Sequence, residues 1–218
     1  MRPGAAPLPP LLVVTDRHGA ARPLAETVRA AVAGGARFVW LRDRDLDREA
    51  RRDLARTLAD LLRPVGGTLV VGGAAELAVE AGAQGVHLPG SAGLDGIRAA
   101  RSRLGAGLVG VSAHSPAEVA AAAEAGADYV TLSPIFPTAS KPGYGPALGL
   151  AALRTACASR LPVFALGGID ADNARACREA GAAGVAVMGG VMRAPDPGGE
   201  SARILAALSG AARERPVF

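Results

Sequence analysis

Short apolar runs and longer amphipathic stretches alternate along the chain. The apolar runs lack the strict alternation of a half-exposed strand, which is typical of parallel strands buried on both faces. Eight runs are predicted as strands, at 11–15, 37–42, 68–72, 84–88, 108–112, 128–132, 162–166 and 184–188. The amphipathic or Ala-rich stretches predict helices at 23–34, 47–63, 93–103, 116–125, 147–159, 171–180 and 198–213, with a shorter one at 74–82.

A related phrase marks the junctions between helices and strands. It reads "AGGARFVW" at 33–40, "EAGAQGVHL" at 80–88, "EAGADYVTL" at 124–132 and "EAGAAGVAVM" at 179–188. In each, a glycine stands where a helix ends in a left-handed residue, and a Val-rich run follows. The repetition indicates that one kind of β–α unit is used along the chain.

Eight such units in 218 residues predict an α/β fold with a single (β/α)8 TIM barrel, which typically needs about 200–250 residues. We expect the barrel domain at 11–213, an N-terminal extension at 1–10 and a C-terminal tail at 214–218. An open doubly wound sheet is the alternative. Its Gly-x-Gly-x-x-Gly fingerprint is missing after the first strand, where the sequence reads "TDRHGAAR".

Composition and charge narrow the class of protein. Half of the residues are hydrophobic and 3% are aromatic, so we expect a core of Ala, Val and Leu. The net charge of +4 comes from arginines scattered among acids, which does not favour a nucleic-acid partner. No apolar run reaches the roughly 18–20 residues of a membrane span, and Cys157 and Cys177 lack metal-ligand spacing. We expect a cytoplasmic protein with no membrane partner, and the sequence leaves a homo-oligomer open.

The active site of such a barrel lies in the loops that follow the strands. The longest predicted loop reads "SPIFPTASKPGYGP" (133–146) and contains Lys141, the sole lysine of the chain. With Thr138 and Ser140 it offers an ammonium and two hydroxyls within four residues, a set suited to phosphate or pyrophosphate oxygens. We predict that this loop binds an anion over the barrel mouth.

Glycine pairs follow the seventh and eighth strands, at Gly167–Gly168 and Gly189–Gly190. A phosphate commonly binds there, because backbone N–H groups and a helix N-terminus face the same point. Either pair alone is best interpreted as a tight turn. The two pairs together predict a phosphate site.

Charged side chains on other strand ends extend this rim. Arg42 and Arg44 alternate after the second strand, so we expect one to face a ligand and the other to pair with Asp43 or Asp45. After the first strand, Asp16 either orders its loop or acts as a base.

Two histidines near strand ends are candidates for proton transfer. His114 follows the fifth strand, where it either exchanges protons near neutral pH or is held by a neighbouring backbone carbonyl. His87 ends the fourth strand and either faces inward or packs against the next helix. Ser112 is a candidate ligand contact, whereas Ser115 is predicted as a helix N-cap in a capping box with Glu118.

Two long stretches carry a family resemblance. They read "VSAHSPAEVAAAAEAGADYVTLSPIFPTASKPG" and "LPVFALGGIDADNARACREAGAAGVAVMGGV". Both resemble the C-terminal half of the thiamine phosphate synthase superfamily, which contains the synthase and the TenI-type thiazole tautomerase. "LLVVTD" and "VWLRDR" are similar to the first two strand motifs of that family, so the resemblance runs from residue 11 to residue 208.

The resemblance implies a barrel enzyme of thiamin biosynthesis. The synthase joins a pyrimidine pyrophosphate to a thiazole phosphate and releases pyrophosphate with Mg²⁺, whereas the tautomerase isomerises a thiazole carboxylate phosphate without metal. By position, the residues that match pyrophosphate contacts of the synthase are Arg42, Ser112 and Lys141. Those that match its thiazole-phosphate site are Thr138, Ser140, Gly168 and the Met188–Gly189 backbone.

Several positions depart from the family pattern. Trp40 stands where the synthase has a Gln near the pyrimidine. Gly72–Gly73 replaces an Asn-Asp pair whose Asp binds magnesium, and Ala92 replaces a second metal-binding Asp. Some tautomerases carry a catalytic His where this chain has Pro134.

Because both metal-binding carboxylates are missing, we favour a metal-independent, TenI-like thiazole tautomerase without a cofactor. His114 and Asp16 are its candidate catalytic residues, and no residue is assigned to a metal. One alternative is a Mg²⁺-dependent thiamine phosphate synthase. Another is a catalytically silent protein that binds thiamin intermediates or has a regulatory role. The expected partners are small molecules: a thiazole phosphate, and a pyrimidine pyrophosphate or thiamine phosphate.

Overall fold

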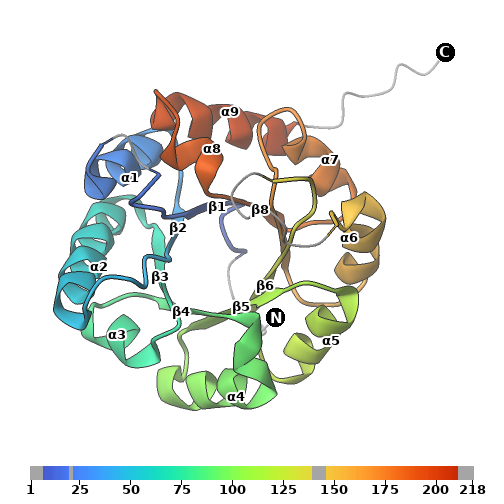
Figure 1. Cartoon of the computed structure of the whole chain (residues 1–218), viewed down its shortest axis with the longest axis horizontal. Coiled ribbons are helices and arrows are strands. Elements are labelled where there is room, and N and C mark those ends of the chain that lie inside the picture. The colour runs from blue at the N-terminus through green and yellow to red at the C-terminus, as the bar shows by residue number, and fades with distance from the viewer. Residues whose placement is uncertain (1–6, 20–21, 139–145, 211–218) are drawn as a thin grey trace.

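Eight parallel strands close into a barrel in the computed structural model, which describes residues 7–19, 22–138 and 146–210 (Figure 1). Each strand pairs with the next in chain order, and the last pairs with the first. The strands are β1 (Leu11–Val14), β2 (Phe38–Leu41), β3 (Thr68–Gly72), β4 (Gly85–Leu88), β5 (Leu108–Ala113), β6 (Tyr129–Leu132), β7 (Val163–Leu166) and β8 (Gly184–Val187). The predicted (β/α)8 barrel is confirmed, and every strand end lies within one residue of its predicted position.

Helices form a ring around the strands (Figure 1). They are α1 (Leu24–Ala33), α2 (Arg48–Leu62), α3 (Ala75–Glu80), α4 (Gly93–Leu104), α5 (Pro116–Glu124), α6 (Gly149–Cys157), α7 (Ala174–Glu179), α8 (Gly189–Met192) and α9 (Pro197–Ser209), with 3₁₀ turns at Arg63–Val65 and Gly90–Ala92. Within the described ranges, none of these helices has the length and apolar character needed to cross a membrane.

The short helix α8 was not predicted. It opens with the Gly189–Gly190 pair, which we assigned to the loop after the eighth strand. Glycine is a poor helix former. Val191 and Met192 of this helix are buried, and the helix contacts α9. Tertiary packing therefore forms a helical turn that local propensity does not favour.

Alternate side chains of each strand face two different apolar layers. Leu11 and Val13 of β1 belong to the layer between the strands and the helices, whereas Leu12 and Val14 belong to the interior of the barrel. The outer layer is made largely of Ala, Val and Leu, as predicted. The buried residues of the interior are Leu12, Val14, Phe38, Trp40, Val70, Tyr129, Phe164 and Ala186.

Most of the aromatic residues that the structure describes lie in the barrel interior. The ring centroids of Phe38, Tyr129 and Phe164 lie 5.3–5.7 Å apart in edge-to-face pairs, a favourable arrangement for aromatic rings. Gly110 on β5 makes room for one of them, because a Cβ there would overlap the Tyr129 ring. A core of Ala, Val and Leu therefore describes the outer layer but not the interior.

Residues from the predicted N-terminal extension contact the end of the barrel where the strands begin. The Pro10 carbonyl accepts a hydrogen bond from the Val185 N–H at 2.8 Å, and Leu8 packs against the interior cluster. These residues therefore take part in closing the barrel beneath the aromatic rings.

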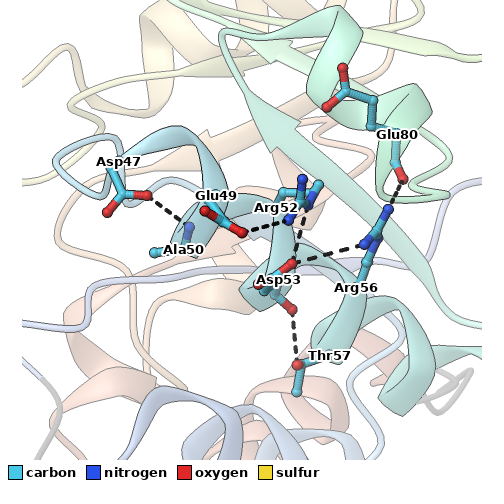
Figure 2. Close-up of polar contacts among 8 residues, drawn as sticks. All are labelled: Asp47, Glu49, Ala50, Arg52, Asp53, Arg56, Thr57 and Glu80. Carbon is cyan, nitrogen blue, oxygen red and sulfur yellow. Dashed lines mark hydrogen bonds and ion pairs between the residues drawn. The ribbon is translucent and has the colours of Figure 1, made fainter.

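The solvent side of α2 carries polar contacts that reach α3 (Figure 2). Arg52 Nε lies 3.2 Å from Asp53 Oδ1, and Arg56 donates to the Glu80 carbonyl at the end of α3 at 3.3 Å. Exposed ion pairs typically contribute about 0–1 kcal/mol. The helix is therefore held mainly by its buried apolar residues, Ala55, Leu58, Ala59 and Leu62.

We expect Gly110→Ala to lower the free energy of unfolding by about 1–3 kcal/mol, because the new methyl group displaces the Tyr129 ring in a packed interior. Chemical denaturation measures this loss. Gly210→Ala is the control, since a Cβ there would meet Ala207 O at an ordinary 3.5 Å. Equal unfolding midpoints for the two variants would contradict the packing argument.

Candidate functional site

The C-terminal ends of the strands open into a cavity of about 1030 Å³. Its wall comes from the loops that follow β1, β2 and β4 to β8. The predicted site residues that line it are Asp16, Arg42, Arg44, Ser112, His114, Thr138, Gly167, Gly168, Met188, Gly189 and Gly190. Ser140 and Lys141 lie outside the described residues, so their anion contacts stay predictions.

Trp40 forms the floor of the cavity and contacts the fully buried His87 ring. The two rings are stacked with their centroids 3.8 Å apart and their planes 32° apart. Trp40 is 5% exposed, points into the barrel and lines the cavity. Its buried indole nitrogen has no hydrogen-bond partner among the residues that the structure describes. A Cβ at Gly72 would lie 3.0 Å from that nitrogen, so the missing side chain on β3 makes room for the indole.

His87 faces inward, as one of the two alternatives predicted. Its Nδ1 lies 2.9 Å from the Tyr129 hydroxyl, and its Nε2 lies 3.1 Å from the Ser112 hydroxyl and 3.3 Å from that of Thr131. Complete burial, and then the charge of Arg44, lower the pKa of His87 to about 3. His87 is therefore neutral at physiological pH. Ser112, which the sequence left without a structural role, contacts this ring.

His114 lies on the rim with its ring held by a backbone carbonyl. Its Nδ1 donates to the Ser133 carbonyl at 2.8 Å, which is one of the two alternatives predicted. Ser115 caps α5 by accepting from the Glu118 N–H at 3.2 Å, as predicted. The Glu118 carboxylate accepts from the His114 N–H at 2.8 Å, one residue before the position expected for a capping box. These bonds fix the ring at the cavity wall and leave its role in proton transfer a prediction.

Arg42 and Arg44 both line the cavity. The Arg42 guanidinium reaches across β1 to the Met188 sulfur, 3.9 Å away. Partial burial, and then the neighbouring Arg42, lower the pKa of Arg44. The Arg44 guanidinium nevertheless stays protonated, because an arginine is not deprotonated in proteins.

The predicted pairing of one of these arginines with Asp43 or Asp45 was wrong. Asp43 is buried and accepts from the Thr15 hydroxyl and, at 2.8 Å, from the Arg17 N–H. Asp45 instead binds the Arg17 guanidinium and His18 Nε2. Residues two apart in an extended chain share a face, so Arg42 and Arg44 can both face the cavity. Asp43 and Asp45 instead order the loop after β1.

Arg51 is a buried cation that the sequence analysis missed. It lies near the start of α2, is 9% exposed and donates to the Gly72 carbonyl at the end of β3. Burial, and then the charge of Arg44, lower its pKa, while Asp43 acts in the opposite direction. The signal was present in the periodicity, because Arg51 occupies the apolar face of α2 together with Ala55.

Arg193 was missed as well. It follows α8, lines the cavity and places a guanidinium nitrogen 3.7 Å from an Asp16 carboxylate oxygen. A Cβ at Gly189 would overlap its guanidinium, so glycine at that position lets the side chain fold over the turn. Asp16 also accepts from the Gly19 N–H at 3.3 Å, consistent with the loop-ordering alternative. A predicted helical turn at this position would have revealed Arg193, because it lies four residues after Gly189 and so falls on the same face of the turn.

The turn at Gly167–Gly168 after β7 lines the cavity and also contacts the loop after β6. Gly167 and Gly168 have φ angles of +95° and +65°, which favour glycine. A Cβ at Gly167 would lie 2.9 Å from Pro134 Cα, and the Phe136 N–H donates to the Gly167 carbonyl at 3.0 Å. These glycines let the loop after β6 lie directly on the turn after β7.

At the two positions where the family resemblance implies magnesium-binding carboxylates, this chain has Gly73 and Ala92. In the described ranges, no three His, Cys, Asp or Glu side chains gather into a metal-binding group. The segments 20–21 and 139–145 contain none of these residue types. The carboxylates that line the cavity all accept hydrogen bonds from the chain itself: Asp16, Asp43, Asp45, Glu118 and Asp170.

Comparison with known proteins identifies the family. The family model described as thiamine monophosphate synthase matches residues 11–191, which is most of the chain. This chain belongs to the thiamine monophosphate synthase family. The resemblance found in the sequence is confirmed, and the chain is a member of a family of thiamine-biosynthetic enzymes.

Individual members of the family match over nearly the whole chain. A putative thiamine-phosphate synthase of Geobacter sulfurreducens is 43% identical over 203 residues, covering 91% of this chain and 93% of the relative. A thiamine-phosphate synthase of Geobacillus thermodenitrificans is 39% identical over 192 residues, 86% of each chain. The structure of thiamine phosphate pyrophosphorylase from Pyrococcus furiosus is similar with a TM-score of 0.83 and 31% identity, covering 92% and 97% of the two chains. These names favour the synthase alternative over the tautomerase that the sequence analysis preferred.

The buried His87 predicts a pH dependence of stability. Its pKa is lowered in the folded state, so between about pH 6.5 and pH 3 the unfolded chain binds a proton that the folded chain does not. Stability is therefore lost as the pH falls through this window, by about 1.4 kcal/mol per pH unit from this residue.

Urea denaturation at pH 6, 5.5 and 5 tests this slope. His87→Gln keeps a polar side chain but cannot titrate, so its unfolding free energy is expected to fall less steeply with acid. Parallel pH profiles for the parent and the variant would show that His87 is not the group responsible.

Proposed function

We propose that this chain catalyses the thiamine-phosphate synthase reaction, the coupling of a pyrimidine pyrophosphate with a thiazole phosphate. Relatives at 36–43% identity that carry the synthase name support this choice. The observation that carries it is an arc of cationic and glycine-lined positions around one cavity, from Arg44 at β2 to Arg193 after β8. Such an arc offers places for two anionic groups, as a reaction between two phosphorylated substrates requires.

The glycine turns after β7 and β8 would hold the thiazole phosphate. Gly168 and Gly189 leave backbone close to the cavity, and the Arg193 guanidinium folds over the second turn. Thr138 lines the same cavity, and a hydroxyl complements phosphate oxygens. Lys141, in the undescribed part of the following loop, is predicted to add a further positive charge.

Arg42 and Arg44 would hold the pyrophosphate of the second substrate. Planar guanidinium groups bind phosphate oxygens through two parallel hydrogen bonds. With the pyrophosphate at β2 and the thiazole phosphate near β8, the two heterocycles would meet over Trp40. Positioning of this kind converts a reaction of two molecules into one within a single complex.

The coupling step makes one bond and breaks one. The thiazole nitrogen forms a bond to the methylene carbon of the pyrimidine, and the bond from that carbon to the pyrophosphate oxygen breaks. The electron pair of the broken bond leaves with pyrophosphate. Negative charge therefore grows on the leaving group, and fixed positive charge around it lowers the barrier.

A thiazole tautomerase is the second candidate. The observation that favours it is the loss of both implied metal-binding carboxylates, at Gly73 and Ala92. His114, fixed at the cavity wall by its bond to Ser133, would then be the group that moves the proton.

Product analysis separates the two reactions. The parent protein is expected to convert a pyrimidine pyrophosphate and a thiazole phosphate into thiamine phosphate and pyrophosphate, in samples with Mg²⁺ or with EDTA. Arg42→Gln is expected to lower the rate strongly, because it removes a charge that faces the leaving group. Isomerisation of a thiazole carboxylate phosphate with no coupling under either condition would replace the synthase proposal with the tautomerase.

Arg193→Gln tests the phosphate site. We expect this change to weaken the binding of a thiazole phosphate roughly 10-fold or more, because it removes a charged hydrogen-bond donor. Trp40 is the sole tryptophan and lines the cavity, so its fluorescence reports the titration. Arg203→Gln is the control, since Arg203 is exposed on α9 and pairs with Glu200 at 3.0 Å. Equal affinities for the two variants would place the phosphate elsewhere.

A further inference from the structure

The guanidinium groups of Arg44 and Arg51 lie at the end of β3, and that of Arg42 reaches from the end of β2 toward Met188. Arg42 and Arg44 line the cavity, and Arg51 stands behind them on α2. The positive charge of Arg42 lowers the pKa of Arg44, and the positive charge of Arg44 lowers the pKa of Arg51. Positive charges held this close repel one another, and an anion bound among them relieves the repulsion.

Of the charges that act on Arg44 and Arg51, one is acidic. Asp43 is the carboxylate that acts on Arg51. Its two oxygens accept from the Thr15 hydroxyl and from the Arg17 N–H. The cluster of Arg42, Arg44 and Arg51 therefore keeps a net positive charge at the cavity.

Two glycines at the end of β3 provide the space for this cluster. A Cβ at Gly72 would lie 3.4 Å from the nearest Arg51 nitrogen, and a Cβ at Gly73 would lie 3.4 Å from Arg44 Cζ. The Arg51 guanidinium also donates to the Gly72 carbonyl. The guanidinium groups thus lie against the place where side chains of residues 72 and 73 would begin. The family resemblance implies a metal-binding carboxylate at position 73, and this chain has none.

We propose that the cluster of Arg42, Arg44 and Arg51 binds a pyrophosphate group without a divalent cation and supplies the charge neutralisation that a metal ion would otherwise provide. This inference rests on the proposed coupling function, in which pyrophosphate is the leaving group. Arg42 and Arg44 face the pyrophosphate. Arg51 is a positioning residue, because it lies behind Arg44 and acts on the ligand through its charge.

The chemistry of the cluster suits this role. A guanidinium remains charged at any working pH, and its fork of N–H groups matches two phosphate oxygens at once. The charges are fixed by the fold before the ligand arrives, so little reorganisation is needed as negative charge develops. Arg51 cannot swing away, because it is 9% exposed and bonded to the Gly72 carbonyl.

Inorganic pyrophosphate is the probe for this site. Calorimetric titration of the full-length protein in EDTA is expected to show binding, and a second titration with Mg²⁺ is expected to show no gain in affinity. Because the probe needs no turnover, the result stands whether or not the protein couples the two substrates. Product analysis under both conditions then tests the proposed function separately.

Variants locate the binding in the cluster. Arg44→Gln is expected to weaken pyrophosphate binding roughly 10- to 100-fold. Arg51→Gln is expected to weaken it too, whereas Arg51→Lys keeps the charge and retains most of the affinity. Arg56→Gln is the matched control, because it removes the same charge from an exposed position on the same helix (Figure 2). Thermal unfolding of each variant separates lost binding from lost folding.

Binding in EDTA that falls in Arg44→Gln and Arg51→Gln, but not in Arg56→Gln, supports the proposal. Binding that requires Mg²⁺ overturns it, and so does the absence of binding under both conditions. Binding in EDTA that is equal in Arg44→Gln and the parent also overturns it, because the pyrophosphate would then lie elsewhere. Equal loss in Arg51→Lys and Arg51→Gln with normal unfolding temperatures would remove Arg51 from the cluster.

Discussion

The stack of Trp40 on His87 is the contact on which the rest of the site depends. It separates an aromatic barrel interior from the cavity above it, so it sets the depth at which a ligand can lie. The stack requires a neutral, buried imidazole, and the hydroxyls of Tyr129 and Ser112 give its two nitrogens hydrogen-bond partners. It also requires a missing side chain at Gly72, beside the indole nitrogen. One aromatic contact thus involves strands β2 to β6.

Above this floor the cavity changes from aromatic to cationic. The ring of Trp40 offers a face for a heterocycle, and the guanidinium groups and glycine turns stand around the rim. A pocket with an apolar base and a few placed charges orients a ligand that has a ring at one end and an anion at the other. The substrates implied by the family have this form. Fold and charge therefore support the same class of ligand, although a barrel by itself does not establish a reaction.

Sequence patterns predicted the barrel well because burial on both faces of a parallel sheet leaves a strong signal. The glycine pairs and the loop carrying Thr138 were found for the same reason, since they follow strands. Arg51 and Arg193 were not found, because each contacts residues that are distant in the chain or depends on an unpredicted helical turn. The pairing of Asp43 was mistaken for a similar reason, as its partners lie on the loop after β1. Local patterns report which residues are buried, whereas contacts between loops of different units depend on the closed barrel.

The arginine cluster and a carboxylate metal site are alternative arrangements at the end of β3. A carboxylate at position 73 would lie beside Arg44, pair with it and cancel the charge that faces the cavity. A larger side chain at Gly72 would collide with Trp40 and disturb Arg51. The two glycines, the indole and the buried arginine therefore lie together at the end of β3. Burial of Arg51 adds to the cost of holding like charges close, and its hydrogen bond to the Gly72 carbonyl offsets part of that cost. The result is a positive site that is already in place when an anionic leaving group forms.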